Sequence, residues 1–223
     1  MHSGAEGAAC MKDIVGLKDV GRLKDGNDDT FRDRLKVRVL AACEAVLASE
    51  GLDGLQARRI AQISDCSVGT LYNIFGDIDG LILQANSRTL DELGRLLKAA
   101  ARRSADGDLE TRLNTLAIAY LDFATANQRR WRAVFEHRMA ETATLPESFQ
   151  EDRRQLLALI ETQLETAILD ADARSDAAHA LFSAVHGIVI MSIDAKLGPF
   201  EPARCERQIR FLVGRVVAGL DRV

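Results

Sequence analysis

Apolar side chains recur with helical spacing along nearly the whole chain, and no proline interrupts them. Only three prolines occur, at positions 146, 199 and 202, each outside a periodic segment. Between residues 31 and 50, the apolar residues fall at i, i+4, i+7, i+8 and i+11, one face of a helix: Leu35, Val39, Ala42, Cys43 and Val46. The alternation of period two that marks strands is not sustained anywhere in the sequence. The pattern predicts an all-α protein of about nine helices.

Capping and breaking residues predict where these helices begin and end. They place helices at 31–50 before Gly51, at 56–63, from Asp77 to a break at 101–108, from Leu109 to Asn127, around Trp131, from Pro146 to about Asp170, from Ser175 to Gly198, and from Pro202 onward. Residues 30–76 therefore form a head of three short helices, and residues 77–223 form a larger helical body. Residues 1–29, of mixed charge and bearing glycines, are expected to be a flexible N-terminal arm.

Charge limits the kinds of partner that suit this chain. It has 223 residues, of which 47% are apolar and 28% charged, with a net charge of −4 and a pI of about 5.6. This balance argues against a protein that coats nucleic acid by bulk electrostatics, although a sequence-specific binder needs only local positive charge. Residues 31–90 contain seven Lys and Arg against seven Asp and Glu, so the head is neutral.

Targeting, redox and catalytic signals are weak. The four cysteines form no C-x-x-C pair, no apolar core of a signal peptide starts the chain, and no apolar run approaches the roughly 20 residues needed to span a bilayer. We therefore expect a cytoplasmic protein without a membrane partner. The sequence carries no motif for a cofactor, a hydrolase elbow, a phosphate loop or a metalloprotease, so we expect neither cofactor nor metal nor catalysis.

The segment QARRIAQISDCSVGTLYNIF, residues 56–75, has the pattern of a helix, a turn and a second helix. Its inward positions are apolar, and Ala61 is small enough to let the two helices cross closely. Asp65 lies in the turn, where aspartate tolerates a left-handed backbone, and Ser67 is a good N-cap for the second helix. Phe75 is expected in the core, and Tyr72 on the surface.

The outward face of the second helix carries short side chains and one phenol: Val68, Gly69, Thr70, Tyr72 and Asn73. Small residues let a helix approach the major groove of DNA. The hydroxyls of Thr70 and Tyr72 can bond phosphates, while Val68 or Asn73 can meet a thymine methyl or a base edge. This face is therefore predicted to contact double-stranded DNA.

The segment from about Arg34 to Leu83 resembles the TetR family of bacterial transcriptional regulators. The resemblance is carried by ASEGLDGL, at the end of the first helix, and by RRIAQISDCSVGTLYNIFGDIDGL, with its S-x-G-T-L-Y-x-x-F core intact. Residues 181–198, LFSAVHGIVIMSIDAKLG, and the upstream LDFATANQRRWRAVFE resemble the C-terminal domain of the WHG-type group within that family.

The resemblance implies a homodimeric regulator, usually a repressor, that binds a palindromic DNA operator and is released by a small-molecule effector held in the body. The residues it assigns to DNA contact are Gln56, Arg58, Ser67, Val68, Thr70, Tyr72 and Asn73. Because the head is neutral, Arg34 is added as a source of local positive charge, together with Arg32 and Lys36. Three positions depart from the family pattern, which commonly has Thr or Ser at 56, Gly at 65 and Lys at 78, where this chain has Gln56, Asp65 and Ile78. The missing lysine removes one cation from the DNA face.

Two sets of side chains in the body are candidates for effector binding and dimerisation. Aromatic, histidine and methionine residues that could line an effector cavity are Trp131, Phe135, His137, Phe182, His186 and Met191, with ordinary core packing as the alternative for each. Apolar residues expected in a dimer interface are Val185, Val189, Ile209, Leu212, Val213, Val216 and Leu220. The penultimate and last long helices of such family members pair with their copies.

Other interpretations stay open beside the regulator. His179 and His186, seven residues apart, could hold a metal, and Cys66 could be a redox switch, although a packing role suits that cysteine better. The main alternative function is a helical small-molecule-binding or interaction protein with the same fold and weak or lost DNA binding. A helical hydrolase or lyase of an unrecognised type is a third.

Overall fold

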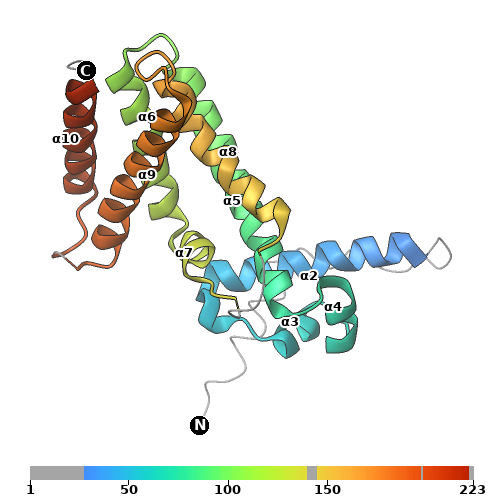
Figure 1. Ribbon diagram of the computed structural model, residues 1–223. Helices are drawn as coiled ribbons and strands as arrows, with labels where there is room; N and C mark the ends of the chain where they lie inside the picture. The colour runs from blue at the N-terminus through green and yellow to red at the C-terminus, as the bar shows by residue number, and fades with distance from the viewer. Residues whose placement is uncertain (1–27, 140–144, 197, 221–223) are drawn as a thin grey trace. The chain divides into compact units, whose positions relative to one another are not determined.

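The computed structural model describes residues 28–139, 145–196 and 198–220 (Figure 1). These residues form nine α-helices and one 3₁₀ helix, η2, and contain no strand. The all-α prediction is therefore confirmed. Apart from the backbone of residues 28 and 29, the arm predicted for residues 1–29 lies outside the described residues.

The chain divides into two compact units. The first contains the described residues up to Ala85 together with Glu136–Met139, and the second contains Asn86–Phe135 and the described residues from 145 onward. The helix α5 (Ile78–Arg103) contributes its first residues to the first unit and the others to the second.

The first unit is built on α2 (Asp28–Glu50), η2 (Leu52–Gly54), α3 (Ala57–Ile63) and α4 (Val68–Phe75). The predicted inward face of α2 is buried, with Leu35, Val39, Ala42, Cys43 and Val46 all at most 3% exposed. α2 contacts both α3 and α4, and α3 contacts α4. Gly51 and Gly76 follow the ends of α2 and α4 with φ of 75° and 84°. Glycine adopts such a positive φ without the steric strain that a side chain would cause.

The second unit is organised around α6 (Leu109–Ala126), which contacts α8 (Glu147–Leu164), α9 (Ala171–Ile193) and α10 (Pro202–Leu220). The short α7 (Gln128–Glu136) follows α6 after the C-cap residue Asn127, as the sequence predicted. Nine of the eighteen residues of α6 are buried, because its apolar and small side chains cover more than one face. Their packing forms the core of this unit.

Two helix boundaries in the second unit differ from the prediction. α8 ends at Leu164 rather than near Asp170, and α9 begins at Ala171 with Asp170 as its N-cap rather than Ser175. The Asp170 carboxylate accepts a hydrogen bond from the Ala173 amide at 2.8 Å, whereas the Ser175 hydroxyl bonds Glu161 at 3.0 Å. A capping carboxylate thus takes the role that the hydroxyl five residues later was expected to play.

The end of α9 also differs, since the helix stops at Ile193 and not at Gly198. Ala195 adopts φ of 53°, and the amides of Ala195 and Lys196 bond the carbonyls of Ser192 and Met191. These paired bonds are the Schellman pattern, normally built with glycine in the left-handed position. An alanine gives no such signal in the sequence.

One described helix, α9, is long and apolar enough by length and composition to cross a membrane, with a mean hydropathy of 1.4 over 18 residues. Only 22% of that window is buried within the protein. A helix that packs against a second subunit has the same composition.

Candidate functional site

The candidate DNA-contacting helix, α4, begins at an N-cap built as the sequence predicted. The Ser67 hydroxyl accepts a hydrogen bond from the Thr70 amide at 3.0 Å and lies 2.8 Å from the Thr70 hydroxyl. The preceding Asp65 has a left-handed backbone with φ of 49°. These contacts fix the turn and both hydroxyl groups at the start of the helix.

One side of α4 is buried and the other faces solvent. Leu71 and Phe75 are 0% and 7% exposed, whereas Tyr72 is 41% exposed and Asn73 is also exposed. Gly69 is exposed, and a Cβ atom there would meet only the Ser67 hydroxyl, at 3.7 Å. The solvent-facing side of α4 is thus low in relief apart from the Tyr72 ring, a shape that can enter the major groove.

Arg32 holds the far end of α4. Its Nη2 donates a hydrogen bond to the Asn73 carbonyl at 3.1 Å, across 41 residues of sequence. The last carbonyls of a helix have no partner within it, so this bond from α2 satisfies one of them and ties the two helices together. Sequence reasoning considered Arg32 only as a source of positive charge.

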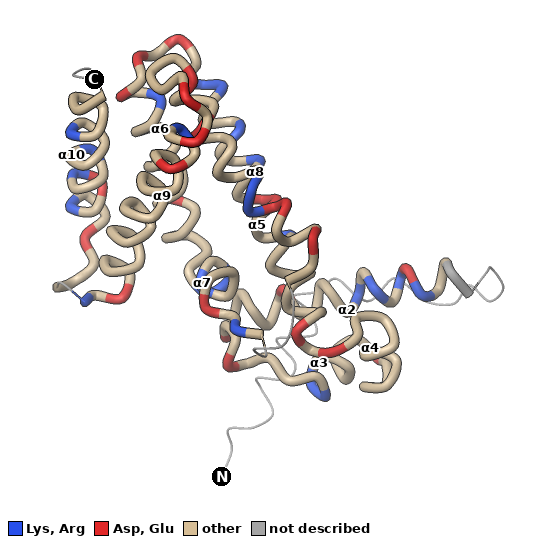
Figure 2. The backbone as a smooth tube through the Cα atoms, viewed as in Figure 1, with Lys and Arg blue, Asp and Glu red and all other residues tan. Residues whose placement is uncertain are grey.

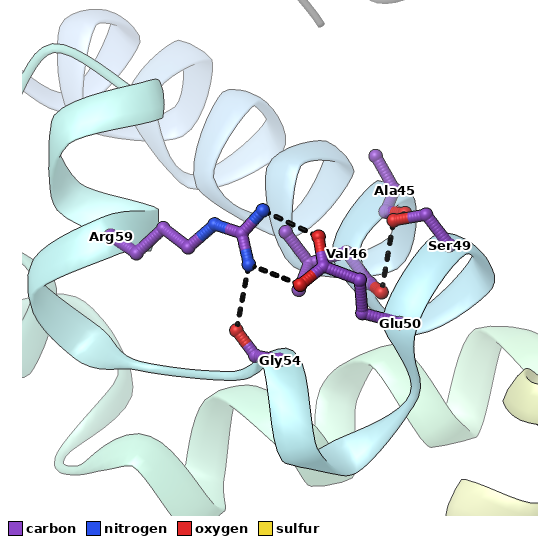
Figure 3. Close-up of polar contacts among 6 residues, drawn as sticks. All are labelled: Ala45, Val46, Ser49, Glu50, Gly54 and Arg59. Carbon is purple, nitrogen blue, oxygen red and sulfur yellow. Dashed lines mark hydrogen bonds and ion pairs between the residues drawn. The ribbon is translucent and has the colours of Figure 1, made fainter. Parts of the chain in front are cut away.

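The two neighbouring arginines of α3 have different environments. Figure 3 shows Arg59 pointing toward the end of α2, where its guanidinium forms two bonds of 2.6 and 2.5 Å to the Glu50 carboxylate. It also donates to the Gly54 carbonyl at 3.4 Å. Arg58 is exposed. Arg59 therefore serves the architecture of the first unit, whereas the side chain of Arg58 faces solvent.

The remaining predicted DNA contacts also lie on the surface of the first unit. Gln56 is exposed at the N-cap of α3, and its side chain makes no capping bond there. Arg34 is exposed on α2, whose first half carries four Lys and Arg residues (Figure 2). Val68 is half-buried. The fold thus brings residues from three helices into one unit.

Cys66 lies half-buried in the turn between α3 and α4. Burial raises the pKa of its thiol, and the charge of Asp65 raises it further, against an opposing effect of Arg38. A raised pKa disfavours the thiolate, which is the reactive form. The environment therefore favours packing over redox chemistry.

The aromatic residues predicted to line an effector cavity separate into three places. Trp131, Phe135, Phe182 and His186 form one cluster in the second unit, with ring centroids 4.5–6.3 Å apart. His137 lies in the first unit, where its Nε2 is 3.3 Å from Asp79 Oδ1. Met191 is 39% exposed and borders a groove between α9 and α10.

Tyr120 belongs to this cluster, since its ring contacts those of Trp131, Phe182 and His186, and it is not among the site residues predicted from the sequence. Its hydroxyl accepts a hydrogen bond from Trp131 Nε1 at 2.9 Å and lies 2.7 Å from His186 Nδ1. Burial raises the pKa of Tyr120 and lowers that of His186, so both are neutral at pH 7. The Tyr120 hydroxyl therefore joins Trp131 and His186 in one chain of hydrogen bonds between neutral side chains.

An apolar cavity of about 60 Å³ lies next to this cluster. Its walls come from α5, α6, α8, α9 and α10, and they are aliphatic apart from Tyr120 and Phe182: Leu93, Leu97, Leu113, Leu116, Ala117, Leu156, Leu159, Ile160, Leu181, Val185 and Val213. Of the six predicted effector residues, only Phe182 borders it.

The two histidines of α9 do not converge on a common site. His179 Nδ1 contacts the carbonyl of Ser175, one turn earlier, at 2.9 Å, while His186 Nδ1 bonds Tyr120. Across the described ranges, no group of three His, Cys, Asp or Glu side chains is arranged to hold a metal ion.

The expected dimer interface needs correction. Val185, Val189, Ile209 and Val213 are at most 7% exposed and belong to the core of their own protomer, so they offer no surface to a partner. The apolar stripes of α9 and α10 are wide, so the residues at their centre pack into the core and the residues at their edges remain partly accessible to solvent. Leu212, Val216 and Leu220 are half-buried at that edge.

The second unit has a recognisable relationship to known proteins. Residues 113–216 match the family model of the "Tetracyclin repressor-like, C-terminal domain". Together with the helix-turn-helix of the first unit, this match decides the family. The chain belongs to the TetR family. No curated protein matches the chain.

Solved structures share the TetR fold over most of this chain. A transcriptional regulator from Rhodococcus sp. Rha1 is 25% identical, with a TM-score of 0.62 over 82% of this chain and 96% of its own. A TetR-family transcriptional regulator from Streptomyces coelicolor is 16% identical, with a TM-score of 0.63 over 84% and 82%. A protein of unknown function from Rhodococcus sp. RHA1 is 21% identical, with a TM-score of 0.65 over 81% and 93%.

Proposed function

We propose that this TetR family member is a cytoplasmic, ligand-responsive transcriptional repressor. It binds a palindromic DNA operator as a homodimer and is released by a small-molecule effector. The observation that carries the proposal is the solvent-facing side of α4, where Thr70, Tyr72 and Asn73 stand on a helix held by the Ser67 cap and by Arg32.

DNA contact divides between α4 and its neighbours. Val68 and Asn73 are assigned to base edges, and the hydroxyls of Thr70 and Tyr72 to phosphates. Arg58 and Arg34 supply cations that position the unit on the backbone of the duplex. Because the segment 31–90 is neutral, the loss of one cation should be measurable. Arg58→Ala should make the slope of log K against log salt concentration less steep by about one.

Homodimerisation is assigned to the exposed sides of α9 and α10. An open groove of about 780 Å³ lies between these helices, bordered by Met191, Phe211 and Leu212. Phe211 is 67% exposed. Large exposed apolar side chains along a mostly unburied apolar helix are expected to be covered by a second copy, because two-fold interfaces are self-complementary.

Effector response is assigned to the second unit. An effector that binds better to one arrangement of the dimer shifts the population toward it, by no more than its differential affinity for the two arrangements. If the favoured arrangement holds the two α4 helices at a separation that does not match successive major grooves, operator affinity falls. The apolar cavity among α5, α6, α8, α9 and α10 is the place in the described protein best suited to such a ligand.

The test is selection of fragmented DNA from the source genome by the purified protein at near-physiological salt. Thr70→Ala/Tyr72→Phe is selected in parallel, and Thr166→Ala, an exposed threonine of the second unit, is the matched control. A palindromic site should be recovered by the wild type and the control and lost by the double variant. Equal recovery by all three proteins would contradict the assignment of α4.

A second function is favoured by one specific observation. The N-terminus of α5, where family members commonly carry a lysine, has Ile78 between Asp77 and Asp79, and Asp77 accepts a bond from the Gly80 amide at 2.7 Å. Two carboxylates there repel a phosphate. A helical small-molecule-binding protein of the same fold, with weak or lost DNA binding, is therefore the alternative. A folded dimer that enriches no DNA fragment even at low salt would establish it.

A further inference from the structure

Two aromatic rings of the second unit take part both in the wall of the apolar cavity and in the aromatic cluster. Tyr120 and Phe182 border the apolar cavity and also pack against His186, with ring centroids 6.3 and 5.7 Å from the imidazole. Phe182 is stacked on His186 at an interplanar angle of 28°. A ligand larger than this cavity of about 60 Å³ must displace side chains of its lining, which include these two rings, because interiors are close-packed.

The far side of these rings connects to two helices. The Tyr120 hydroxyl bonds Trp131 on α7 and His186 on α9, at 2.9 and 2.7 Å. α7 is held in turn by a bond of 2.9 Å from Asn86 to the Ala133 carbonyl and by an ion pair between Arg132 and Asp194 at the end of α9. A displacement of Tyr120 therefore changes contacts that involve α7 and the proposed dimer helix α9 together.

The cavity lining restricts the chemistry of an occupant. Its only polar side-chain group is the Tyr120 hydroxyl, which already has two hydrogen-bond partners. A carboxylate or an ammonium placed there would lose its hydration without a partner, at a cost of several kcal/mol. A site lined by aliphatic side chains and two aromatic rings instead suits small apolar molecules.

We propose that the cavity takes a small uncharged apolar molecule and that Tyr120 is the positioning residue that transmits its presence to Trp131 and His186. The inference deepens the proposed function, because it names the ligand class of the effector site and its connection to α9. It depends on that function only for its biological role, since binding and transmission are measurable without DNA.

The protein contains a single tryptophan, so its tryptophan fluorescence reports on the surroundings of Trp131. Toluene is titrated into the purified protein, with benzoate as the charged analogue of similar ring size, and thermal unfolding is recorded in parallel. Toluene should change Trp131 emission saturably and raise the melting temperature, and benzoate should do neither at the same concentration. No saturable response to toluene, or an equal response to benzoate, overturns the proposed ligand class.

Three variants separate binding from transmission. Ala117→Val fills part of the cavity and should abolish the response, while Ala126→Val, at the exposed end of the same helix, should keep it. Tyr120→Phe should keep the toluene-induced rise in melting temperature but lose most of the emission change. If Tyr120→Phe does not fold, Phe182→Leu serves the same purpose. An emission change as large as that of the wild type in whichever of these two variants is used overturns the role of the rings.

Operator release is measured separately, as the effect of toluene on binding to a selected DNA site. Binding and transmission that leave operator affinity unchanged would support the cavity inference and contradict the proposed effector response. A protein that binds its operator but gives no toluene response would contradict the inference and leave the proposed function standing.

Discussion

Removing one oxygen atom from Tyr120 should cost more stability than its size suggests. In Tyr120→Phe, the Nε1–H of Trp131, a residue only 1% exposed, loses its acceptor, and His186 Nδ1 loses its hydrogen-bond partner. A buried polar group left unpaired costs about 1–3 kcal/mol. His186 is only half-buried and can recover a water, so its share lies at the low end. The sum is about 2–4 kcal/mol, or roughly 4–16 °C in melting temperature for a protein of this size.

The other tyrosine of the chain supplies the matched control. Tyr72 is 41% exposed on α4, so Tyr72→Phe removes a hydroxyl that water already satisfies and should change stability by less than about 0.5 kcal/mol. Chemical denaturation followed by circular dichroism measures both variants. Equal stability of Tyr120→Phe and Tyr72→Phe would refute the hydrogen-bonded chain as described.

Three further outcomes are expected. Arg59→Lys keeps the charge but loses the pair of hydrogen bonds to the Glu50 carboxylate, so it should destabilise the first unit by about 0.5–1 kcal/mol. This loss should be smaller in 1 M salt. An unchanged denaturation midpoint would argue against a role for the paired bonds. Burial lowers the pKa of both His137 and His186 from the ordinary value of 6.5, so the unfolded chain takes up protons at a higher pH than the folded protein does. The free energy of unfolding should therefore fall as the pH drops below 6.5. A free energy of unfolding that stays constant from pH 7 to 5 would contradict these buried environments. Asp170→Ala removes the N-cap of α9 and should cost about 1 kcal/mol in urea denaturation; no loss would mean that the helix starts elsewhere.

The first unit was the more predictable part of the chain, because its signals are local. The apolar stripe of α2, the Ser67 cap and the Asp65 turn each depend on residues within one or two helical turns, and all three are present. The role of Arg32 was not predictable, since its bond to the Asn73 carbonyl joins residues 41 positions apart.

The second unit was less predictable because its important contacts are long-range. Trp131, Phe135, Phe182 and His186 were singled out as candidates, yet nothing in their spacing shows that they form one cluster or that Tyr120 bonds both Trp131 and His186. The start of α9 was misplaced because Asp170 and Ser175 are both competent N-caps, and the choice depends on Glu161 occupying the serine hydroxyl.

The predicted dimer residues show a different limit of sequence patterns. A broad apolar stripe reveals that a helix has much to bury, but not which part packs within its own chain. On α9 and α10 the centre of the stripe, Val189 and Ile209, is completely buried in the protomer, while Phe211 remains 67% exposed.

The central claim, that α4 reads DNA sequence, is tested most directly by an affinity ratio. The dissociation constants for a selected palindromic duplex and for a scrambled duplex of equal composition are compared at physiological salt. We predict a preference of about 10³-fold or more for the wild type, typical of specific binding, and its collapse in Val68→Ala/Asn73→Ala, which removes the side chains assigned to base edges. Equal affinity of the folded, dimeric wild type for both duplexes would contradict the account.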